Sequence, residues 1–498
     1  MKKSNPVKEK LNLLNKDIAF LNKLTALQFY RLCYWQETTS KLNYRRFFTV
    51  NDLICLNIQH QDVFDHYHRY IVELVKKGVF QGLRIDHIDG LAHPELYLER
   101  LRTAVGKDIY ISVEKILAVD EQLPNSWSTQ GDTGYDFLQL ANNVLTNTSA
   151  ESELTKFYKQ YIKEDISPSE LEPKKKKNIL NEQMGGELAN LRKLFEDLNF
   201  GNTKKLSALP SKDLERAIGE LLVHCPVYRF YDTKFPLSKN AKSALASTFK
   251  KAKEQSSNKS ALSFLEASLL EETTDEAALE NRSVFYNRCM QFSGPLMAKG
   301  VEDTLMYNYN RLLAHNEVGD SLKRFGISIK HYHKEMHKRF ATFPYAMNAT
   351  ATHDTKRGED TRTRLIALAH KPERWMHLVA ELDELIDKEN IHPNDVYFVY
   401  QTLIGAFPLD DIDFKQFKVR VEDYLEKVLR EAKRRSDWAK PDSNYEETVG
   451  RFASSLVERI SKSDKLQQIP SEIIDDGLFN SLLQTVLKLT SPGIPDIY

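Results

Sequence analysis

The sequence predicts an α/β protein that contains part of a parallel β/α barrel, interrupted by large helical insertions. Three short apolar runs each lead to a carboxylate, at Asp86, Glu114 and Asp354. In a parallel barrel the strand bodies fill the closed core, and the carboxyl-terminal rim carries the chemistry. Two aspartates and a glutamate on one rim indicate chemistry on glycosidic bonds.

The first apolar run, residues 79–86, ends in Leu-Arg-Ile-Asp. Alternation along a strand places Arg84 and Asp86 on the same side, so the guanidinium can hold the carboxylate ionised. An ionised Asp86 is a competent nucleophile.

The second run, residues 109–114, ends at Glu114 and is followed by Lys115, which alternation directs away from it. Partial burial of Glu114 would raise its pKa toward that of a general acid. A retaining glycosidase or transglycosylase needs one ionised carboxylate and one carboxylic acid about 5–5.5 Å apart. Asp86 and Glu114 fit that pair, and Asp354, beside His353, would hold sugar hydroxyls as positive charge develops.

Each of these residues has a structural interpretation when it is taken alone. Acidic residues at strand ends commonly cap the next helix. Arg84 could be an ion-pair partner, and His353 could be a core histidine. The order and context of the three carboxylates favour the catalytic interpretation.

The three segments resemble, in the same order, the nucleophile, acid/base and stabiliser segments of the α-amylase superfamily, glycoside hydrolase family 13. They read GLRIDHIDG (82–90), ISVEKI (111–116) and ATHDTKRGEDTR (351–362). Other blocks resemble the maltooligosyltrehalose synthase family within it: NYRRFF (43–48), TGYDFL (133–138), PVYRFY (226–231), GPLMAKGVEDT (294–304) and SPGIPDIY (491–498).

The resemblance implies an intramolecular transglucosylation that converts the reducing-end α-1,4 linkage of a maltooligosaccharide to α,α-1,1, in trehalose biosynthesis. Asp86 would be the nucleophile, Glu114 the general acid/base and Asp354 the stabiliser. The resemblance implies a maltodextrin substrate, no cofactor, no metal, and maltooligosyltrehalose trehalohydrolase as pathway partner. The expected substrate-binding residues are Arg84, His87, His353, Trp127, Tyr135, Lys299 and Lys356.

Several of these expectations have alternatives. Trp127 and Tyr135 follow the Glu114 strand, where a sugar ring could stack on them, although most aromatic residues belong to the core. Lys299 could belong to a glycine turn that precedes a helix cap, and Lys356 could pair with nearby carboxylates. Another glucanotransferase or hydrolase of the superfamily would use the same three carboxyl groups. A further possibility is an inactive fragment that at most binds maltodextrin.

The expected organisation is a partial (β/α)8 TIM barrel, strands four to eight. It divides into a helical lead-in, two barrel segments, two helical insertions and a last strand: 1–42, 43–149, 150–290, 291–359, 360–489 and 490–498. Pro295-Leu-Met-Ala is the expected sixth strand. Within the insertions, capping residues and apolar spacing predict helices that begin at Ser211, at Pro372 and at Phe414, the last one extending to Ala432. Because no Asp-x-x-x-Asn-His segment precedes Asp86, we expect a fragment without the first three strands and the C-terminal domain.

Composition narrows the class of protein. The 498 residues are 41% apolar, with 70 basic and 70 acidic side chains, which argues against binding of nucleic acid. The lysine run 174–177 is expected on a solvated helix face. Four scattered cysteines without a CxxC pair indicate a reducing cytoplasm, and no apolar run of about 20 residues predicts a membrane span. A phosphotransferase is disfavoured because no glycine-rich phosphate loop is present.

Overall fold

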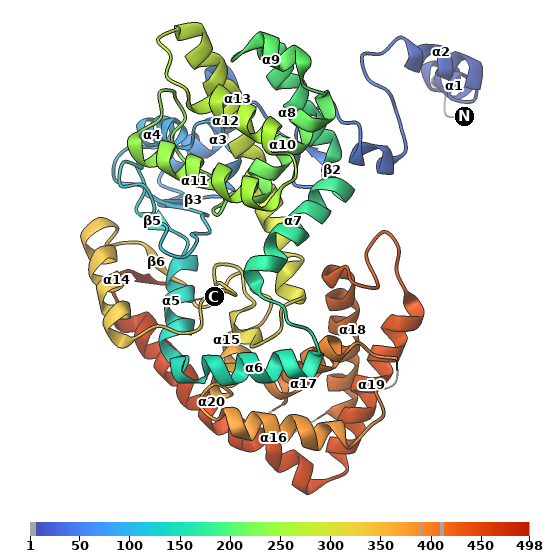
Figure 1. The fold of residues 1–498 in the computed structure, drawn as a ribbon, viewed down its shortest axis with the longest axis vertical. Helices are drawn as coiled ribbons and strands as arrows, with labels where there is room; N and C mark the ends of the chain where they lie inside the picture. Colours follow the sequence, from blue (N-terminus) through green and yellow to red (C-terminus); the bar gives the residue numbers. More distant parts are fainter. Residues whose placement is uncertain (1–5, 389, 409–412, 498) are drawn as a thin grey trace.

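The computed structural model describes residues 6–388, 390–408 and 413–497 (Figure 1). The strands are β1 (Arg46–Phe47), β2 (Val50–Ile54), β3 (Gly82–Ile85), β4 (Tyr110–Val113), β5 (Gly131–Asp132), β6 (Met347–Asn348) and β7 (Ile494–Pro495). The α-helices are α1 (Pro6–Leu14), α2 (Ile18–Ala26), α3 (Gln61–Lys76), α4 (Pro94–Val105), α5 (Tyr135–Leu145), α6 (Glu151–Ile162), α7 (Pro168–Gln183), α8 (Gly185–Leu198), α9 (Thr203–Ala208), α10 (Ser211–Val223), α11 (Lys239–Gln255), α12 (Lys259–Leu270), α13 (Glu276–Met297), α14 (Ile329–Thr342), α15 (Glu359–Ala367), α16 (Pro372–Asp383), α17 (Pro393–Ala406), α18 (Phe414–Ala432), α19 (Ser443–Ser461) and α20 (Asp464–Thr490).

The parallel strands form two small sheets. β3, β4 and β5 pair in that order, and β6 pairs with β7, all in parallel. β5 lies against the chain at β6, because a Cβ added at Gly131 would lie 2.5 Å from the Cβ of Ala346. β1 and β2 form a separate antiparallel hairpin.

Two helices cover the first strands. α3 buries Phe64 and Val75 at helical spacing, and α4 begins with Pro94 at a position where its missing N–H costs nothing. Their apolar sides form one core with Ile111 and Val113 of β4, which are fully buried. This core fixes where β3 and β4 end, and therefore where the residues after them lie.

The first helical insertion has a core of its own. Side chains of α7, α8 and α10–α13 form a continuous apolar cluster. α10 begins at Ser211, as its apolar spacing predicts, and α13 begins at Glu276 with Asp275 as its cap. These helices gather above the sheet in Figure 1.

The second helical insertion packs around α17. The predicted helix starts at Pro372 and Phe414 are confirmed as the first residues of α16 and α18. Residues of α6 share this core, although α6 lies within the predicted first insertion, residues 150–290. The six segment boundaries drawn from the sequence stay a prediction.

The sixth strand was wrongly predicted. Pro295-Leu-Met ends α13, and residues Ala298–Glu302 continue it as one turn of π-helix. Leu296 and Met297 are buried, and a four-residue apolar run fits a buried helix as well as it fits a strand. The strand that lies beside β4 is β5, which is only two residues long and has no apolar run that would predict a strand.

The lysine run 174–177 lies on α7 as predicted and exposes Lys174 and Lys177, but it is not solvated throughout. Lys176 is 1% exposed, lies 2.9 Å from Glu172 and donates to the carbonyl of Cys225. One member of this run is therefore a buried structural cation. No helix within the described ranges is long and apolar enough to cross a bilayer.

Candidate active site

Asp86 and Glu114 lie at the ends of two adjacent parallel strands. β3 and β4 pair from Gly82 opposite Tyr110 to Ile85 opposite Val113, so the next residue of each strand is a carboxylate. The Glu114 N–H donates to the Ile85 carbonyl at 2.8 Å, which continues the ladder to the site. Strand pairing alone therefore brings these two side chains together.

Arg84 joins the two carboxylates. One guanidinium nitrogen donates to Asp86 Oδ1 at 2.6 Å, and the other donates to Glu114 Oε1 at 3.2 Å. The Asp86 side chain is 56% exposed, whereas that of Glu114 is 13% exposed. One fork thus holds a solvated and a buried carboxyl group in fixed relation.

The two carboxyl groups have opposite pKa shifts. Burial raises the pKa of Glu114 to about 7, and the neighbouring Asp86 charge adds to this effect. Burial is the largest single influence on Asp86 and raises its pKa, but the hydrogen bonds from Arg84 and Glu114 and the charge of Arg84 together outweigh burial, so the pKa of Asp86 is lowered. Below pH 7 the site therefore holds one ionised and one protonated carboxyl group, as double displacement at a sugar requires.

His87 contributes its main chain to this pair. Its N–H donates to Glu114 Oε2 at 2.7 Å, and its backbone has a left-handed φ of 48°. Its ring packs on Phe47 and Phe48, with centroid distances of 5.1 and 4.9 Å. A Cβ at Gly90 would lie 2.4 Å from this ring, so glycine is required there. Sugar binding by the His87 ring stays a prediction.

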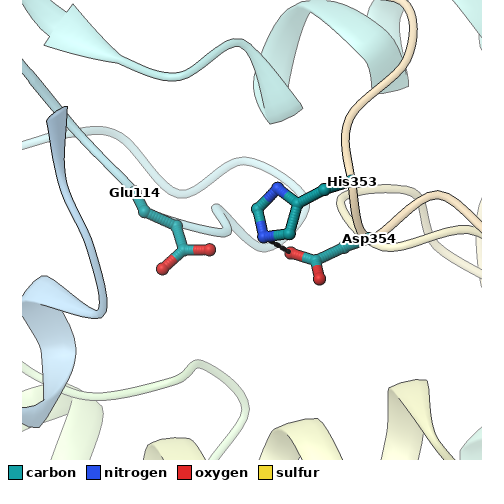
Figure 2. A group of neighbouring side chains, drawn as sticks. All are labelled: Glu114, His353 and Asp354. Carbon is teal, nitrogen blue, oxygen red and sulfur yellow. Dashed lines mark ion pairs between the residues drawn. The ribbon is translucent and has the colours of Figure 1, made fainter.

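Asp354 faces Glu114 from the other side of the site (Figure 2). The Tyr135 hydroxyl donates to Asp354 Oδ2 at 2.7 Å, and His353 Nε2 lies 3.4 Å from the same oxygen. One polar atom from each of Glu114, His353 and Asp354 lies within 4.8 Å of the others. All three predicted catalytic carboxylates therefore meet at one place.

The Asp354 loop is fixed by a buried ion pair that the sequence did not reveal. Glu317 is fully buried, lies 3.1 Å from Arg357 and accepts a hydrogen bond from the Lys356 N–H at 2.5 Å. Glu317 lies about 40 residues before the loop and in none of the recognised motifs. No sequence signal could have assigned it to this role.

Lys299 and Lys356 flank one carboxylate. Lys299 Nζ donates to Asp303 at 2.7 Å, and Lys356 Nζ lies 3.9 Å from the same side chain. Lys356 is also 4.9 Å from the ring centroid of Tyr307. The alternative pairing of Lys356 with Glu359 or Asp360 is absent from the described ion pairs, and sugar binding by either lysine stays a prediction.

Glu302 adds a second carboxyl group with a raised pKa. It lies on the π-helical turn and accepts a hydrogen bond from the Tyr228 hydroxyl. Burial raises its pKa to about 7, with Asp303 and Asp354 adding to the effect. Below pH 7 this buried carboxyl group is therefore protonated.

The two aromatic candidates have other roles. Trp127 is 4% exposed and packs edge-on against Tyr231, with ring centroids 4.9 Å apart, so the expected stacking on sugar is not met in this structure. Tyr135 is 1% exposed and reaches the site through its hydroxyl, not its face. Both residues follow β4 as predicted, but packing directs their rings inward.

Two carboxylates and an imidazole can also bind a divalent cation. Both oxygens of Glu114 already accept hydrogen bonds, from Arg84 and from the His87 N–H. Arg84 therefore competes with a cation for this carboxylate. The arrangement fits acid and nucleophile chemistry better than a metal centre.

No family model matches the chain. A putative maltooligosyl trehalose synthase of Mycobacterium tuberculosis is 29% identical over 473 residues, which is 95% of this chain. The structure of maltooligosyltrehalose synthase from Arthrobacter ramosus covers 96% of this chain with a TM-score of 0.82 and 31% identity. The chain is similar to maltooligosyltrehalose synthases.

A hypothetical maltooligosyl trehalose synthase of Sulfolobus tokodaii has the same fold over 98% of this chain, with a TM-score of 0.78 and 31% identity. The helix-rich α/β fold is therefore one that these synthases share. The chain spans 58% of the Mycobacterium and Arthrobacter synthases and 60% of the Sulfolobus one.

Proposed function

We propose that this chain carries the catalytic carboxyl groups of an intramolecular transglucosylation on maltooligosaccharides. The observation that carries the proposal is the Arg84 fork, which joins an Asp86 of lowered pKa to a Glu114 whose pKa is about 7. Resemblance to maltooligosyltrehalose synthases over 95–98% of the chain supports the same substrate and linkage change.

In the proposed first step, an Asp86 oxygen attacks the anomeric carbon of the penultimate glucose. The α-1,4 bond breaks, and Glu114 gives its proton to the departing oxygen of the reducing-end glucose. Asp354 holds sugar hydroxyls as positive charge develops on the ring, while Tyr135 keeps the carboxylate in place.

In the second step, the released glucose turns over and its anomeric hydroxyl attacks the glycosyl-enzyme. Glu114 takes the proton of that hydroxyl, Asp86 leaves, and an α,α-1,1 bond forms. The product keeps every glucose of the substrate but has no reducing end. Maltooligosyltrehalose trehalohydrolase would consume it, and the four free thiols support a cytoplasmic location.

Hydrolysis is the second candidate, because one observation favours it. The Asp86 side chain is 56% exposed, so water could reach a glycosyl-enzyme formed on it. Both reactions use the same three carboxyl groups. They differ in what attacks the intermediate.

Maltopentaose separates the two reactions. Transglucosylation should lower the reducing-sugar signal while the mass of the pentasaccharide stays constant. Hydrolysis should raise that signal and yield shorter chains. The product assay therefore assigns the acceptor without any assumption about the mechanism.

A second experiment tests the acid role. Glu114→Gln should lose turnover of maltopentaose but still release fluoride from an α-maltosyl fluoride in the first turnover, because fluoride leaves without a proton. Equal loss on both substrates would contradict the role of Glu114. The matched control is Glu95→Gln, at an exposed carboxyl group on α4, which should leave both rates unchanged.

A further inference from the structure

The turn that follows Asp86 has a strained backbone. His87 has a left-handed φ of 48°, a conformation that a residue with a Cβ keeps only when its surroundings hold it. In this conformation the His87 N–H donates to Glu114 Oε2 at 2.7 Å. Any contact that holds the turn therefore also holds a hydrogen bond to the proposed acid.

The turn is held through Asp89, which is 4% exposed. One carboxyl oxygen of Asp89 accepts a hydrogen bond from the Tyr231 hydroxyl, and the other lies 3.2 Å from Lys115 Nζ. The Asp89 carbonyl accepts a hydrogen bond from the Arg229 guanidinium at 3.0 Å. Asp89 is therefore bound at both carboxyl oxygens and at its main chain, by residues of two other segments of the chain.

Lys115 connects this anchor to the acid. It directly follows Glu114, and alternation along the strand directs it to the opposite side, where it is 1% exposed. Its Nζ also lies 3.2 Å from Glu121, so its charge has two buried partners. The ion pair between Asp89 and Lys115 lies beside the hydrogen bond from the turn to Glu114. Both interactions join the same two segments.

The sequence block PVYRFY (226–231) lies behind these two segments. The rings of Tyr228 and Tyr231 have their centroids 5.2 and 5.6 Å from Lys115 Nζ. Arg229 is 1% exposed and also donates to the Leu91 carbonyl, which follows the turn. None of the described hydrogen bonds joins this block to the three proposed catalytic carboxyl groups. The block therefore acts on the site through the turn that it holds.

The hydrogen bond from the turn also acts on the charge of Glu114. Burial raises the pKa of Glu114, and the His87 N–H is the strongest of the influences that lower it. The other charged and titratable groups around Glu114 belong to the site itself: Arg84, Asp86, Tyr135, His353 and Asp354. Loss of the hydrogen bond from the turn should therefore raise this pKa further.

We propose that Asp89 is a positioning residue for Glu114. Its contacts with Lys115 and Tyr231 hold the turn. The His87 N–H in that turn then fixes the orientation of the Glu114 carboxyl group, which gives its proton in one direction. This inference rests on the proposed function, because the oriented proton is the one that the departing glucose receives.

The competing interpretation is that Asp89 only stabilises the fold. Removal of a buried partner from an ion pair destabilises a protein wherever the pair lies. Such a loss lowers activity equally at every pH and leaves the pKa of Glu114 unchanged. A positioning role instead changes that pKa, and with it the pH at which activity falls.

Two variants test the positioning role. Asp89→Asn removes the charge that faces Lys115, and Tyr231→Phe removes a single hydroxyl and is the milder change. In Asp89→Asn, hydrogen exchange at the His87 amide should become about tenfold faster, because the amide loses its partner. The pKa of Glu114, measured by carboxyl-carbon NMR and assigned with Glu114→Gln, should rise by about one unit. Tyr231→Phe should change both quantities in the same direction by a smaller amount.

Turnover adds a second readout. In Asp89→Asn, kcat for maltopentaose at pH 6 should fall about tenfold with little change in KM, because only proton transfer is impaired. The pH at which activity falls should move upward together with the pKa of Glu114. A lower kcat with an unmoved pH profile would overturn the proposal in favour of a purely structural role.

Tyr286→Phe is the matched control. The Tyr286 hydroxyl is fully buried and has no hydrogen-bond partner among the described residues, so its removal should leave exchange, pKa and kcat unchanged. Unchanged His87 exchange and Glu114 pKa in folded Tyr231→Phe would overturn the proposal, even where Asp89→Asn does not fold. Neither quantity depends on turnover. Hydrolysis of maltopentaose by the wild-type chain would therefore contradict the proposed function and leave the positioning role to these two measurements.

Discussion

The two sides of the candidate active site are built differently. Asp86 and Glu114 follow directly on paired strands, so the backbone ladder sets their positions. Asp354 lies on a loop beyond β6, and buried partners distant in sequence hold it, above all Glu317. The positions of the two strand-side residues are robust, because many backbone hydrogen bonds fix them together. The loop side depends on a few side chains, so single substitutions there should affect it strongly.

The largest effect is expected on the strand side. Asp86→Asn removes the nucleophile, and kcat should fall roughly 10⁴-fold or more with no glycosyl-enzyme detectable by mass spectrometry. Asp62→Asn, at an exposed position on α3, is the matched control and should keep full activity. An active Asp86→Asn variant would contradict the role of Asp86 as nucleophile.

The loop side should be broken by Glu317→Gln. Arg357 would then be a buried cation without its counter-ion, which costs about 3–5 kcal/mol of unfolding free energy in comparable cases. Denaturant titration measures this loss. Glu335→Gln breaks a partly exposed pair with Lys338 and should cost less than about 1 kcal/mol. Similar losses of unfolding free energy for the two variants would show that the loop side does not depend on the buried Glu317 pair.

The pH dependence of stability tests the raised pKa of Glu114 on the strand side. Because the folded-state pKa of Glu114 is about 7, above its ordinary 4.5, the stability linked to this group is complete below pH 4.5 and is lost as pH rises through 7. The loss should be about 3 kcal/mol. Glu114→Gln should lack this part of the pH profile of unfolding, and wild-type activity should fall above pH 7. An unchanged stability difference from pH 4 to 8 would contradict the raised pKa.

The smallest expected effect is at the junction of the two sides. Tyr135→Phe removes the 2.7 Å hydrogen bond to Asp354, and kcat should fall about tenfold with little change in KM. Tyr332→Phe removes a hydroxyl bonded to Ser491 instead and should not change kcat. A change in KM alone would indicate that Tyr135 contacts substrate and does not position Asp354.

Sequence patterns predicted the features that depend on local backbone conformation. Strand ends at Asp86 and Glu114, and the helix from Phe414 to Ala432, follow from apolar spacing and turn residues, and all are confirmed. The direction of Trp127 into the core and the burial of Lys176 depend on neighbours that are remote in sequence. No pattern within a short window contains that information.

The same limit applies to the loop side of the site. His353 and Asp354 stand in a recognisable motif, so their presence was predictable. The contacts that hold this loop were not predictable, because Glu317 and Tyr135 come from other segments of the chain. The role of Glu317 and Tyr135 is defined only by contacts of 2.5–3.1 Å that form in the folded chain. The π-helical turn at Ala298–Glu302 was missed for a similar reason, since a helix and a strand bury a short apolar run equally well.

The fork of Arg84 also has a pharmacological consequence. Below pH 7, Asp86, Arg84 and a protonated Glu114 together carry no net charge, and above it they carry one negative charge. A sugar mimic with a protonated ring nitrogen should therefore bind more tightly at pH 8 than at pH 6, provided its amine stays protonated. A neutral mimic of the same shape should bind equally well at pH 6 and pH 8. The ratio of the affinities of the charged and neutral mimics at each pH therefore reports whether Glu114 is protonated in the intact site.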